Sequence, residues 1–335
     1  MTNRSFKMSN DMSCDYKINY GVPQGSILGP LLFLIYIYDM KNIAPHIKSI
    51  VYADDTTLII TGRSHNEALQ KSNAILQRYY DYYNINKITL NGDKTKYMIY
   101  SKNNKSYRGK EINLYINGQQ LQRVKEIKFL GVIINDKLTW DNHKIYIKKK
   151  ISRNISIMYK SRRIMEPKDL LNMYNCFVLP YLLYCLPLWG GSVDTKDDII
   201  VKIQNKILRI LFRTKRSEKA WELADESIVP IKILYKLEIA KFCYKHLNNK
   251  LPKYFYETIM PCFVSDKHNL NTRQRENKNY HITTNDFLPR TAKSFHVNCI
   301  KLWNEITPSI KQQINIHKFI AQLSKYYFLL NRQAR

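Results

Sequence analysis

Acidic residues are scarce in this chain of 335 residues. Asp and Glu number 27 against 54 Lys and Arg, which gives a formal net charge of +27 and an isoelectric point near 9.7. A field of this sign attracts polyanions, so nucleic acid is the first candidate partner and an anionic membrane surface is the second. The joint abundance of Lys, Asn, Ile and Tyr also fits a biased coding sequence, in which the excess charge would only form a solvated basic face.

Paired cysteines and long apolar runs are missing as well. The six cysteines are scattered, with no pair at the spacing of metal ligands, so we expect reduced thiols in an intracellular protein and no zinc knuckle. Residues 1–15 are polar throughout and contain no signal peptide. The apolar run 27–38 is too short to cross a bilayer and predicts a buried helix. We therefore expect a protein of the nucleus or cytoplasm that is neither secreted nor bound to a membrane.

Glycine is absent beyond Gly191, and eight of the ten glycines lie between Gly21 and Gly131. Because glycine marks turns with positive φ, the first part of the chain should be a turn-rich α+β domain and the remainder chiefly helical. We expect one domain over residues 1–142, a basic helical domain over 143–213, and a C-terminal helical region over 214–335 with a polar linker near 265–285.

The spacing of apolar residues predicts the individual elements. A helix should start near Pro30, and a second should run from Ser64 to Asn84, since Ser64 and Glu67 form a capping box. A β-rich run at 49–61 and short strands at 87–90, 97–101, 112–116 and 124–134 should share one sheet. The helices expected beyond it lie at 143–165, 168–186 and 197–212, with a last helical piece around residues 303–319.

Two adjacent acids, Asp54 and Asp55, interrupt the β-rich run directly after Tyr52 and Ala53. Neighbouring side chains of a strand point to opposite faces, so two such carboxylates approach one cation only where the backbone turns, as at a hairpin tip. Two-metal nucleotidyl transfer needs carboxylate oxygens that hold cations ~3.5–4 Å apart. An ordinary polar hairpin would show the same pair, so the surrounding motifs have to decide.

A glycine-rich turn, Gly21 to Gly29, precedes this hairpin. Glycines let a backbone approach a nucleotide closely, and Gln24 offers both a donor and an acceptor to a base or sugar edge. The same stretch also serves as a turn before a core helix, and both interpretations can hold together.

As an ordered series, these motifs resemble the reverse transcriptases of non-long-terminal-repeat, jockey-like retrotransposons. Residues 21–33 resemble the element before the palm helix, and Tyr52 to Asp55 resembles the metal-binding box of that family. Residues 91–98 resemble the next element, and Phe129 to Val132 resembles the primer-grip hairpin that leads into the thumb. The resemblance extends to the stretches 181–191 and 268–275.

The resemblance implies the remainder of a right-hand polymerase palm, an antiparallel sheet with packed helices, followed by a mostly helical thumb and C-terminal region. Asp54 and Asp55 would hold Mg²⁺, with Mn²⁺ as the alternative, and Lys94 would lie near the leaving pyrophosphate. The residues that would line the pocket for nucleotide and template are Pro23, Gln24, Gly25, Ser26, Tyr52 and Ala53.

The resemblance also implies contacts with primer and duplex. Phe129, Leu130 and Gly131 would position the primer end. The residues that would track the nucleic-acid backbone are Lys144, Lys148, Lys149, Arg153, Arg162 and Arg163. The implied partners are an RNA template, a DNA primer and deoxynucleoside triphosphates. The simpler alternatives are a solvated surface for Lys94 and for the basic helix, and sheet packing for Leu130.

The sequence departs from the family upstream of Gly21. Members of the family carry another catalytic aspartate in a preceding strand, together with fingers, whereas only 20 residues precede Gly21 here. Asp11 and Asp15 stand too close to the turn to replace it. We therefore expect that the N-terminal palm and the fingers are missing and that the polypeptide is inactive alone. The alternatives are a nucleic-acid-binding remnant or domesticated protein without catalysis, and a group II intron maturase, which shares the metal box.

Overall fold

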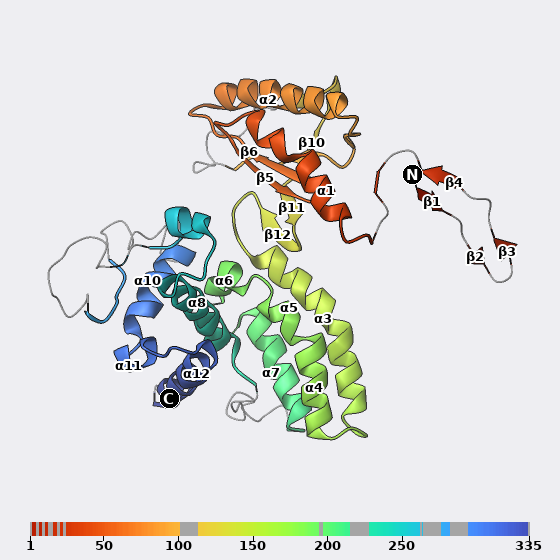
Figure 1. The fold of residues 1–335 in the computed structure, drawn as a ribbon. Coiled ribbons are helices and arrows are strands. Elements are labelled where there is room, and N and C mark those ends of the chain that lie inside the picture. The colour runs from red at the N-terminus through yellow and green to blue at the C-terminus, as the bar shows by residue number, and fades with distance from the viewer. Residues whose placement is uncertain are drawn as a thin grey trace. The chain divides into compact units, whose positions relative to one another are not determined.

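The structure is a computed structural model that describes residues 2–4, 7–8, 11–12, 16–18, 21–22, 25–100, 113–193, 197–214, 228–261, 263, 276–281 and 294–333. The chain divides into two compact units, Met1–Lys125 and Glu126–Arg335. The first is a small α+β unit and the second is mostly helical, so the α+β class expected from the sequence is confirmed at this level (Figure 1).

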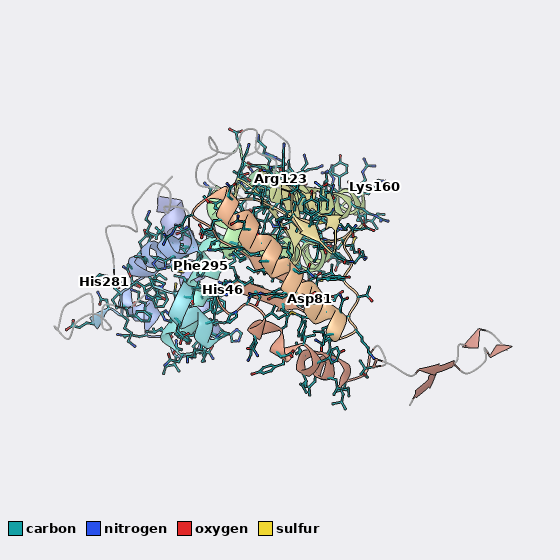
Figure 2. All side chains as sticks on the ribbon, turned by 90° about the horizontal axis from the view of Figure 1, so that it is seen from above. His46, Asp81, Arg123, Lys160, His281 and Phe295 are labelled. Atoms are coloured by element: carbon teal, nitrogen blue, oxygen red, sulfur yellow. The ribbon has the colours of Figure 1, made fainter. Side chains whose placement is uncertain are left out.

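The first unit is built around one hairpin and one long helix. Strand β5 (Lys48–Tyr52) pairs antiparallel with β6 (Asp55–Ile59), as predicted. Helix α2 (His65–Ile85) begins at Ser64, whose side chain accepts a hydrogen bond from the Glu67 backbone N–H at 3.2 Å. Half of the predicted capping box is therefore present, while the Glu67 carboxylate accepts from the Arg63 backbone N–H. Asp81 lies towards the end of α2 (Figure 2).

Helix α2 contributes to two separate small cores. On one face, Ile75, Tyr79 and Tyr83 are buried against residues of the helix 29–36 and the turn that follows it. On another face, Leu69, Leu76 and Tyr80 pack on the buried residues Leu114, Ile116 and Leu121.

The prediction that the strands of this part of the chain share one sheet is wrong, because the described strands form separate two-stranded sheets. No strand forms at 87–90, where Lys87 takes a positive φ of 52° and the backbone turns away from α2. Most of the remaining strands have only two residues, too few for a wide ladder. They pair as β1 (Thr2–Arg4) with β4 (Tyr16–Ile18), β2 (Lys7–Met8) with β3 (Asp11–Met12), β7 (Lys96–Tyr97) with β10 (Gln122–Arg123), and β8 (Tyr115–Ile116) with β9 (Gln119–Gln120).

The apolar run 27–38 forms helix α1 (Gly29–Tyr36) and the start of the short 3₁₀ helix η1 (Tyr38–Asn42). A proline stands in the first turn of α1, as expected. The prediction that this run is buried is wrong, since Ile27 is 95% exposed and Ile35 is 63% exposed. Only Phe33, Ile37 and the residues of the following turn contact the core of this unit.

The second unit opens with a hairpin and a layer of helices. Strand β11 (Glu126–Phe129) pairs antiparallel with β12 (Val132–Asn135), so the stretch 124–134 is a hairpin and not one strand. The helices that follow are α3 (Asp141–Ser161), α4 (Pro167–Phe177), α5 (Leu179–Leu183), α6 (Leu186–Trp189), the 3₁₀ turn η3 (Gly190–Ser192) and α7 (Ile199–Leu211). Helix α3, which carries Lys160 near its end, packs on α4, α5 and α7 (Figures 1 and 2).

The helix predicted at 168–186 is broken into pieces. Tyr184 is extended and Cys185 is left-handed with φ at 50°, and Pro180 and Pro187 occupy the first turns of α5 and α6. Proline lacks the N–H that would continue a helix, so each proline starts a new segment. The two prolines indicate these breaks, whereas the apolar spacing by itself predicts one continuous helix.

The C-terminal helices share one core with the helices before them. They are α8 (Ile231–Leu247), the π-helical turn η5 (Phe255–Ile259), α10 (Phe295–Glu305), α11 (Pro308–Lys311) and α12 (Ile316–Gln333). Buried side chains from Ile147 to Tyr327 form a single cluster, so the predicted boundary at 213/214 does not separate two cores. The predicted boundary at 142/143 differs as well, because hairpin β11–β12 packs on α3 and belongs to the second unit. Within the described residues, no helix is long and apolar enough to cross a membrane.

Candidate functional site

The two adjacent acids lie at the tip of hairpin β5–β6. Tyr52 pairs with Asp55, so Ala53 and Asp54 are the two residues of the turn, and Ala53 has a φ of 50°. All four side chains are exposed. None of the ion pairs among the described residues involves Asp54 or Asp55. The turn thus presents two neighbouring carboxylates to solvent, where a cation can reach them.

Helix α2 anchors this hairpin one residue beyond Asp55. The Tyr83 hydroxyl donates to Thr56 Oγ1 at 3.1 Å, and both hydroxyl groups lie 3.9 Å from the Met40 sulfur. Burial raises the pKa of Tyr83, so this hydroxyl stays protonated and keeps its role as a donor. Thr56 and Met40 were not predicted from the sequence, because nothing in their spacing marks a contact with α2.

The glycine-rich turn is described only in part, since Pro23 and Gln24 lie outside the described residues. Gly25 has a φ of 87°, a conformation that favours glycine. Ser26 Oγ accepts a hydrogen bond from the Gly29 backbone N–H at 3.1 Å and so orders the start of α1. Ser26 therefore has a local structural role, whatever it contributes to nucleotide binding.

Lys94 is exposed in a tight turn between α2 and β7. Its backbone N–H donates to Asn91 Oδ1 at 3.1 Å, and the Thr95 N–H donates to the Asn91 carbonyl at the same distance. A Cβ on Gly92 would lie 2.2 Å from Gln119 Oε1, so the exposed Gln119 side chain would have to move to admit any other residue. The turn is well defined, and the Lys94 side chain extends from it into solvent.

The hairpin tip meets part of what a divalent cation requires. Two carboxylates with water completing the shell suit Mg²⁺, which keeps several waters when it binds proteins. The described part of the chain contains no group of three Asp, Glu, His or Cys side chains that could hold a metal. Asp54 and Asp55 therefore fit as ligands of one weakly held cation, and not as a full two-metal set.

The predicted primer-grip residues form the turn of hairpin β11–β12. Leu130 and Gly131 have φ values of 43° and 86°, as in a two-residue type I′ turn. The Tyr184 hydroxyl donates to the Leu130 carbonyl at 2.6 Å, and a Cβ on Gly131 would lie 3.1 Å from the Tyr184 ring. Tyr184 thus fixes the tip of this hairpin against the α5–α6 junction. The resemblance covered residues 181–191 but assigned Tyr184 no role.

His143 joins the same hairpin to the first turn of α3. Its Nδ1 accepts a hydrogen bond from the Ile133 backbone N–H at 3.3 Å, and its ring lies edge-on to Trp189 with centroids 5.7 Å apart. Burial lowers the pKa of His143, so the ring is neutral and Nδ1 can accept. The hairpin, α3 and α6 are therefore connected through one buried imidazole.

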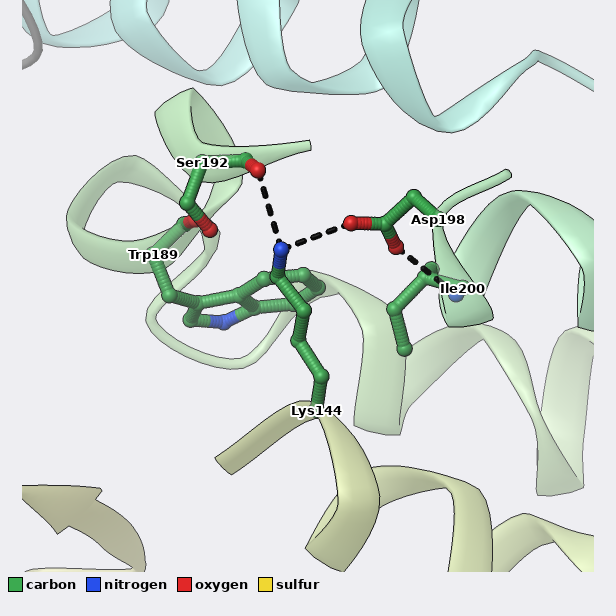
Figure 3. A network of polar contacts seen from close by, with 5 residues as sticks. All are labelled: Lys144, Trp189, Ser192, Asp198 and Ile200. Carbon is green, nitrogen blue, oxygen red and sulfur yellow. Dashed lines mark hydrogen bonds and ion pairs between the residues drawn. The ribbon is translucent and has the colours of Figure 1, made fainter. Parts of the chain in front are cut away.

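Lys144, predicted to contact the nucleic-acid backbone, is buried instead. Its ammonium donates to Asp198 Oδ2 at 2.6 Å and to the Ser192 carbonyl at 2.9 Å (Figure 3). The exposed fractions of the two charged side chains are 6% and 9%. Asp198 Oδ1 also accepts from the Ile200 N–H at 2.8 Å, which caps α7. Lys144 cannot reach a nucleic acid from this position, so its assignment is corrected to a structural one.

The other predicted basic residues have accessible side chains. Lys148, Lys149 and Arg153 are exposed on α3, and Arg163 is exposed just beyond it. Arg162 is half-buried, with its guanidinium 4.3 Å from the centre of the Tyr159 ring. Side chains at these positions are accessible to a nucleic-acid backbone, as the predicted contacts require.

Residues 2–134 match the family model for reverse transcriptase (RNA-dependent DNA polymerase). This segment is therefore similar to the reverse transcriptase family. A probable RNA-directed DNA polymerase from transposon X-element of Drosophila melanogaster is 25% identical over 207 residues, which is 60% of this chain and 22% of that protein. RNA-directed DNA polymerases from mobile element jockey of Drosophila funebris and Drosophila melanogaster are 26% and 27% identical, over 62% of this chain and 23% of each relative.

These matches confirm the resemblance to jockey-like reverse transcriptases. The chain spans less than a quarter of the length of these relatives. The reverse transcriptase segment includes the Asp54–Asp55 turn and ends inside β12, so it extends across the first unit and into the hairpin of the second. The similarity to this family therefore covers both the candidate metal ligands and the candidate primer grip.

Proposed function

We propose that this chain supplies the metal-binding palm hairpin, the primer grip and the thumb of an RNA-directed DNA polymerase. The observation that carries the proposal is the two-residue turn of β5–β6, which presents Asp54 and Asp55 side by side, exposed and without an ion pair among the described residues. A carboxylate pair free of other partners is available to a divalent cation.

In this proposal each group of residues has its own role in nucleotidyl transfer. Asp54 and Asp55 hold Mg²⁺ or Mn²⁺, which when bound would activate the primer hydroxyl and neutralise the leaving phosphates. Lys94 stands near the pyrophosphate, and Gln24 and Gly25 line the nucleotide and template pocket with their neighbours in the two motifs. Hairpin β11–β12, fixed by Tyr184 and His143, positions the primer end.

In the same proposal, the exposed cations on α3 and just beyond it bind the duplex. Lys148, Lys149, Arg153 and Arg163 contact phosphates of the template–primer duplex without selecting a sequence. The substrates are an RNA template, a DNA primer and deoxynucleoside triphosphates. Because the described residues offer only two neighbouring carboxylates, we expect no primer extension from this polypeptide alone.

Cation binding at the hairpin tests the proposal directly. Electron paramagnetic resonance of titrated Mn²⁺ should show a weak site that Asp54→Asn removes. Asp81→Asn is the matched control, since Asp81 is an exposed acid on α2 whose carboxylate accepts from Gln77 Nε2 and from no other described residue. Equal Mn²⁺ binding by the wild type and by Asp54→Asn would contradict the polymerase interpretation of this hairpin.

A primer-extension assay with Mg²⁺ and deoxynucleotides tests the second part. No product is expected from the wild-type chain. Robust synthesis that Asp54→Asn abolishes would show that the carboxylate set is complete in this polypeptide, contrary to our expectation.

The second candidate function is nucleic-acid binding without catalysis. It is favoured by the basic surface of the helical unit, which does not depend on the carboxylate pair: residues 126–335 contain 37 Lys and Arg against 18 Asp and Glu. A chain that binds RNA with an affinity that falls steeply with salt, yet shows no Mn²⁺ site at Asp54, would favour this candidate over a polymerase.

A further inference from the structure

A basic groove of about 750 Å³ lies between the end of α3 and one face of α7. Helix α7 contributes residues at helical spacing, so they share one face. The residues that line the groove are Tyr159, Arg162, Lys202, Asn205, Lys206, Arg209, Ile210 and Thr214. None of the α7 residues, nor Thr214, belongs to the site described above.

The groove concentrates positive charge, and no acidic residue lines it. Its lining contains four cations and no carboxylate. Lys202 forms an exposed ion pair with Asp197 at 3.1 Å, whereas the described residues provide no ion pair for Arg162, Lys206 or Arg209. Like charges one turn apart on a helix repel each other, so this arrangement favours occupation by an anion.

Two buried polar atoms of the lining have no partner. Arg209 Nε and Thr214 Oγ1 are inaccessible to solvent and form no hydrogen bond within the described part of the chain. An unpaired buried donor is costly, and a charged acceptor satisfies it best. A phosphate oxygen accepts from a guanidinium and from a hydroxyl, but both atoms are covered in this structure, so either side chain would have to turn towards the groove to donate to it.

Tyr159 adds an aromatic surface to the rim. Its side chain is 51% exposed, and the Arg162 guanidinium lies 4.3 Å from its ring centre. Single-stranded nucleic acid is bound through phosphates in a basic groove and through bases stacked on aromatic rings. A duplex keeps its bases stacked internally, so it offers no free base to the Tyr159 ring.

We propose that the α3–α7 groove binds a single-stranded segment of nucleic acid, with phosphates at Lys206 and Arg209 and a base stacked at Tyr159. The inference deepens the proposed function and rests on it for the class of partner. It assigns to α7 a strand-binding site separate from the duplex-tracking face of α3.

Fluorescence anisotropy with a labelled, unstructured 12-nucleotide RNA tests the proposal on the full chain. EDTA is present and nucleotides are omitted, so that the result does not depend on the hairpin carboxylates. Lys206→Gln combined with Arg209→Gln should weaken binding by roughly 10-fold at 0.1 M salt and reduce the slope of log K against log salt by about 1.4.

The matched control is Lys318→Gln combined with Lys325→Gln, which removes two exposed charges from α12. It should change the affinity by less than about 3-fold, because it alters only the long-range field. Tyr159→Leu should weaken binding about 5-fold or more with no change in the salt slope. A single-stranded DNA of the same sequence tells whether the site prefers RNA, and either strand supports the proposal.

Three results would overturn the proposal. The first is an equal loss in the groove variant and the α12 control, which would mean that only net charge matters. The second is an equal loss of duplex binding in the groove variant, and the third is unchanged affinity in Tyr159→Leu. Circular dichroism of each variant ensures that a loss reflects binding and not unfolding. Asp54→Asn should bind the RNA as the wild type does, which separates failure at the groove from failure of the proposed polymerase.

Discussion

At the scale of single residues, the charge on Lys144 matters for stability and not for a ligand. A lysine ammonium taken out of water has to be compensated by a carboxylate and further acceptors. Asp198 and the Ser192 carbonyl provide that compensation, and the same carboxylate caps α7. The pair therefore connects the first turn of α3 to the start of α7.

We predict that Lys144→Met destabilises the helical unit by about 3–5 kcal/mol, because it leaves the Asp198 carboxylate buried and unpaired. Urea unfolding followed by circular dichroism measures the change. Lys148→Met is the control, since Lys148 is exposed one turn later on the same helix and should change the stability by less than about 0.5 kcal/mol.

The double variant Lys144→Met with Asp198→Asn should recover most of the loss. Asparagine removes the buried charge and can still accept the Ile200 N–H as a helix cap. A Lys144→Met variant as stable as Lys148→Met would show that the pair contributes little.

The sequence located the turn that carries Asp54 and Asp55 better than it located the basic contacts. The turn at Ala53 and Asp54 was predictable because neighbouring acids inside a β-rich run favour a hairpin tip. Lys144 was misassigned because a run of lysines does not show which face of a helix is buried. The signal was available: Lys144 lies three and seven residues before Ile147 and Ile151, on the buried stripe of α3.

At the scale of elements, hairpin β11–β12 depends on a neutral histidine. His143 Nδ1 accepts from the Ile133 N–H, and its Nε2 has no partner among the described residues. Protonation would turn Nδ1 into a donor and place a charge in a buried site next to Lys144. The hairpin should therefore detach from α3 as the imidazole gains a proton.

We predict that stability falls on acidification below about pH 6.5. Burial lowers the pKa of His143 in the folded state, so the unfolded chain takes up the proton first as the pH falls. The stability is fully present above the unfolded pKa and is lost progressively as the pH falls through the folded pKa. Urea unfolding at pH 7.5, 6.5 and 5.5 measures this loss.

His143→Gln should show a flatter dependence on pH than the wild type, because glutamine can accept the Ile133 N–H without titrating. His317→Gln removes an exposed histidine of α12 and should follow the wild-type curve. The prediction fails where His143→Gln and the wild type lose the same stability over this range.

The helices were predictable as elements, whereas the strands were largely not. Apolar spacing and capping residues located α2, α3 and α7 to within a few residues, since these signals are local. Strand pairing depends on partners that are distant in the sequence. The short strands 96–97 and 122–123, for example, pair in parallel although other strands lie between them in the sequence. For helix α1 the prediction of a helix is correct and the prediction of burial is wrong. Its composition is apolar, but most of its apolar side chains are exposed.

At the scale of the whole molecule, the two units differ in how much core they hold. The second unit contains one cluster of buried side chains that extends from α3 to α12. The first has two small clusters on opposite parts of α2, and α1 leaves most of its apolar side chains exposed. Since burial of apolar surface is the main source of stability, the first unit should be the weaker of the two.

We predict that the chain unfolds in two steps, with the first unit melting at the lower temperature. Differential scanning calorimetry should resolve two transitions, and a polypeptide of residues 126–335 should reproduce the upper one alone. Lys144→Met should lower only the upper transition, because its partners all lie in the second unit. Ile75→Ala opens a cavity in the core of the first unit and should destabilise that unit by about 2–5 kcal/mol. It should therefore shift only the transition at the lower temperature. A single transition that both variants shift together would show that the two units fold as one, and the candidate metal hairpin would then share the stability of the helical core.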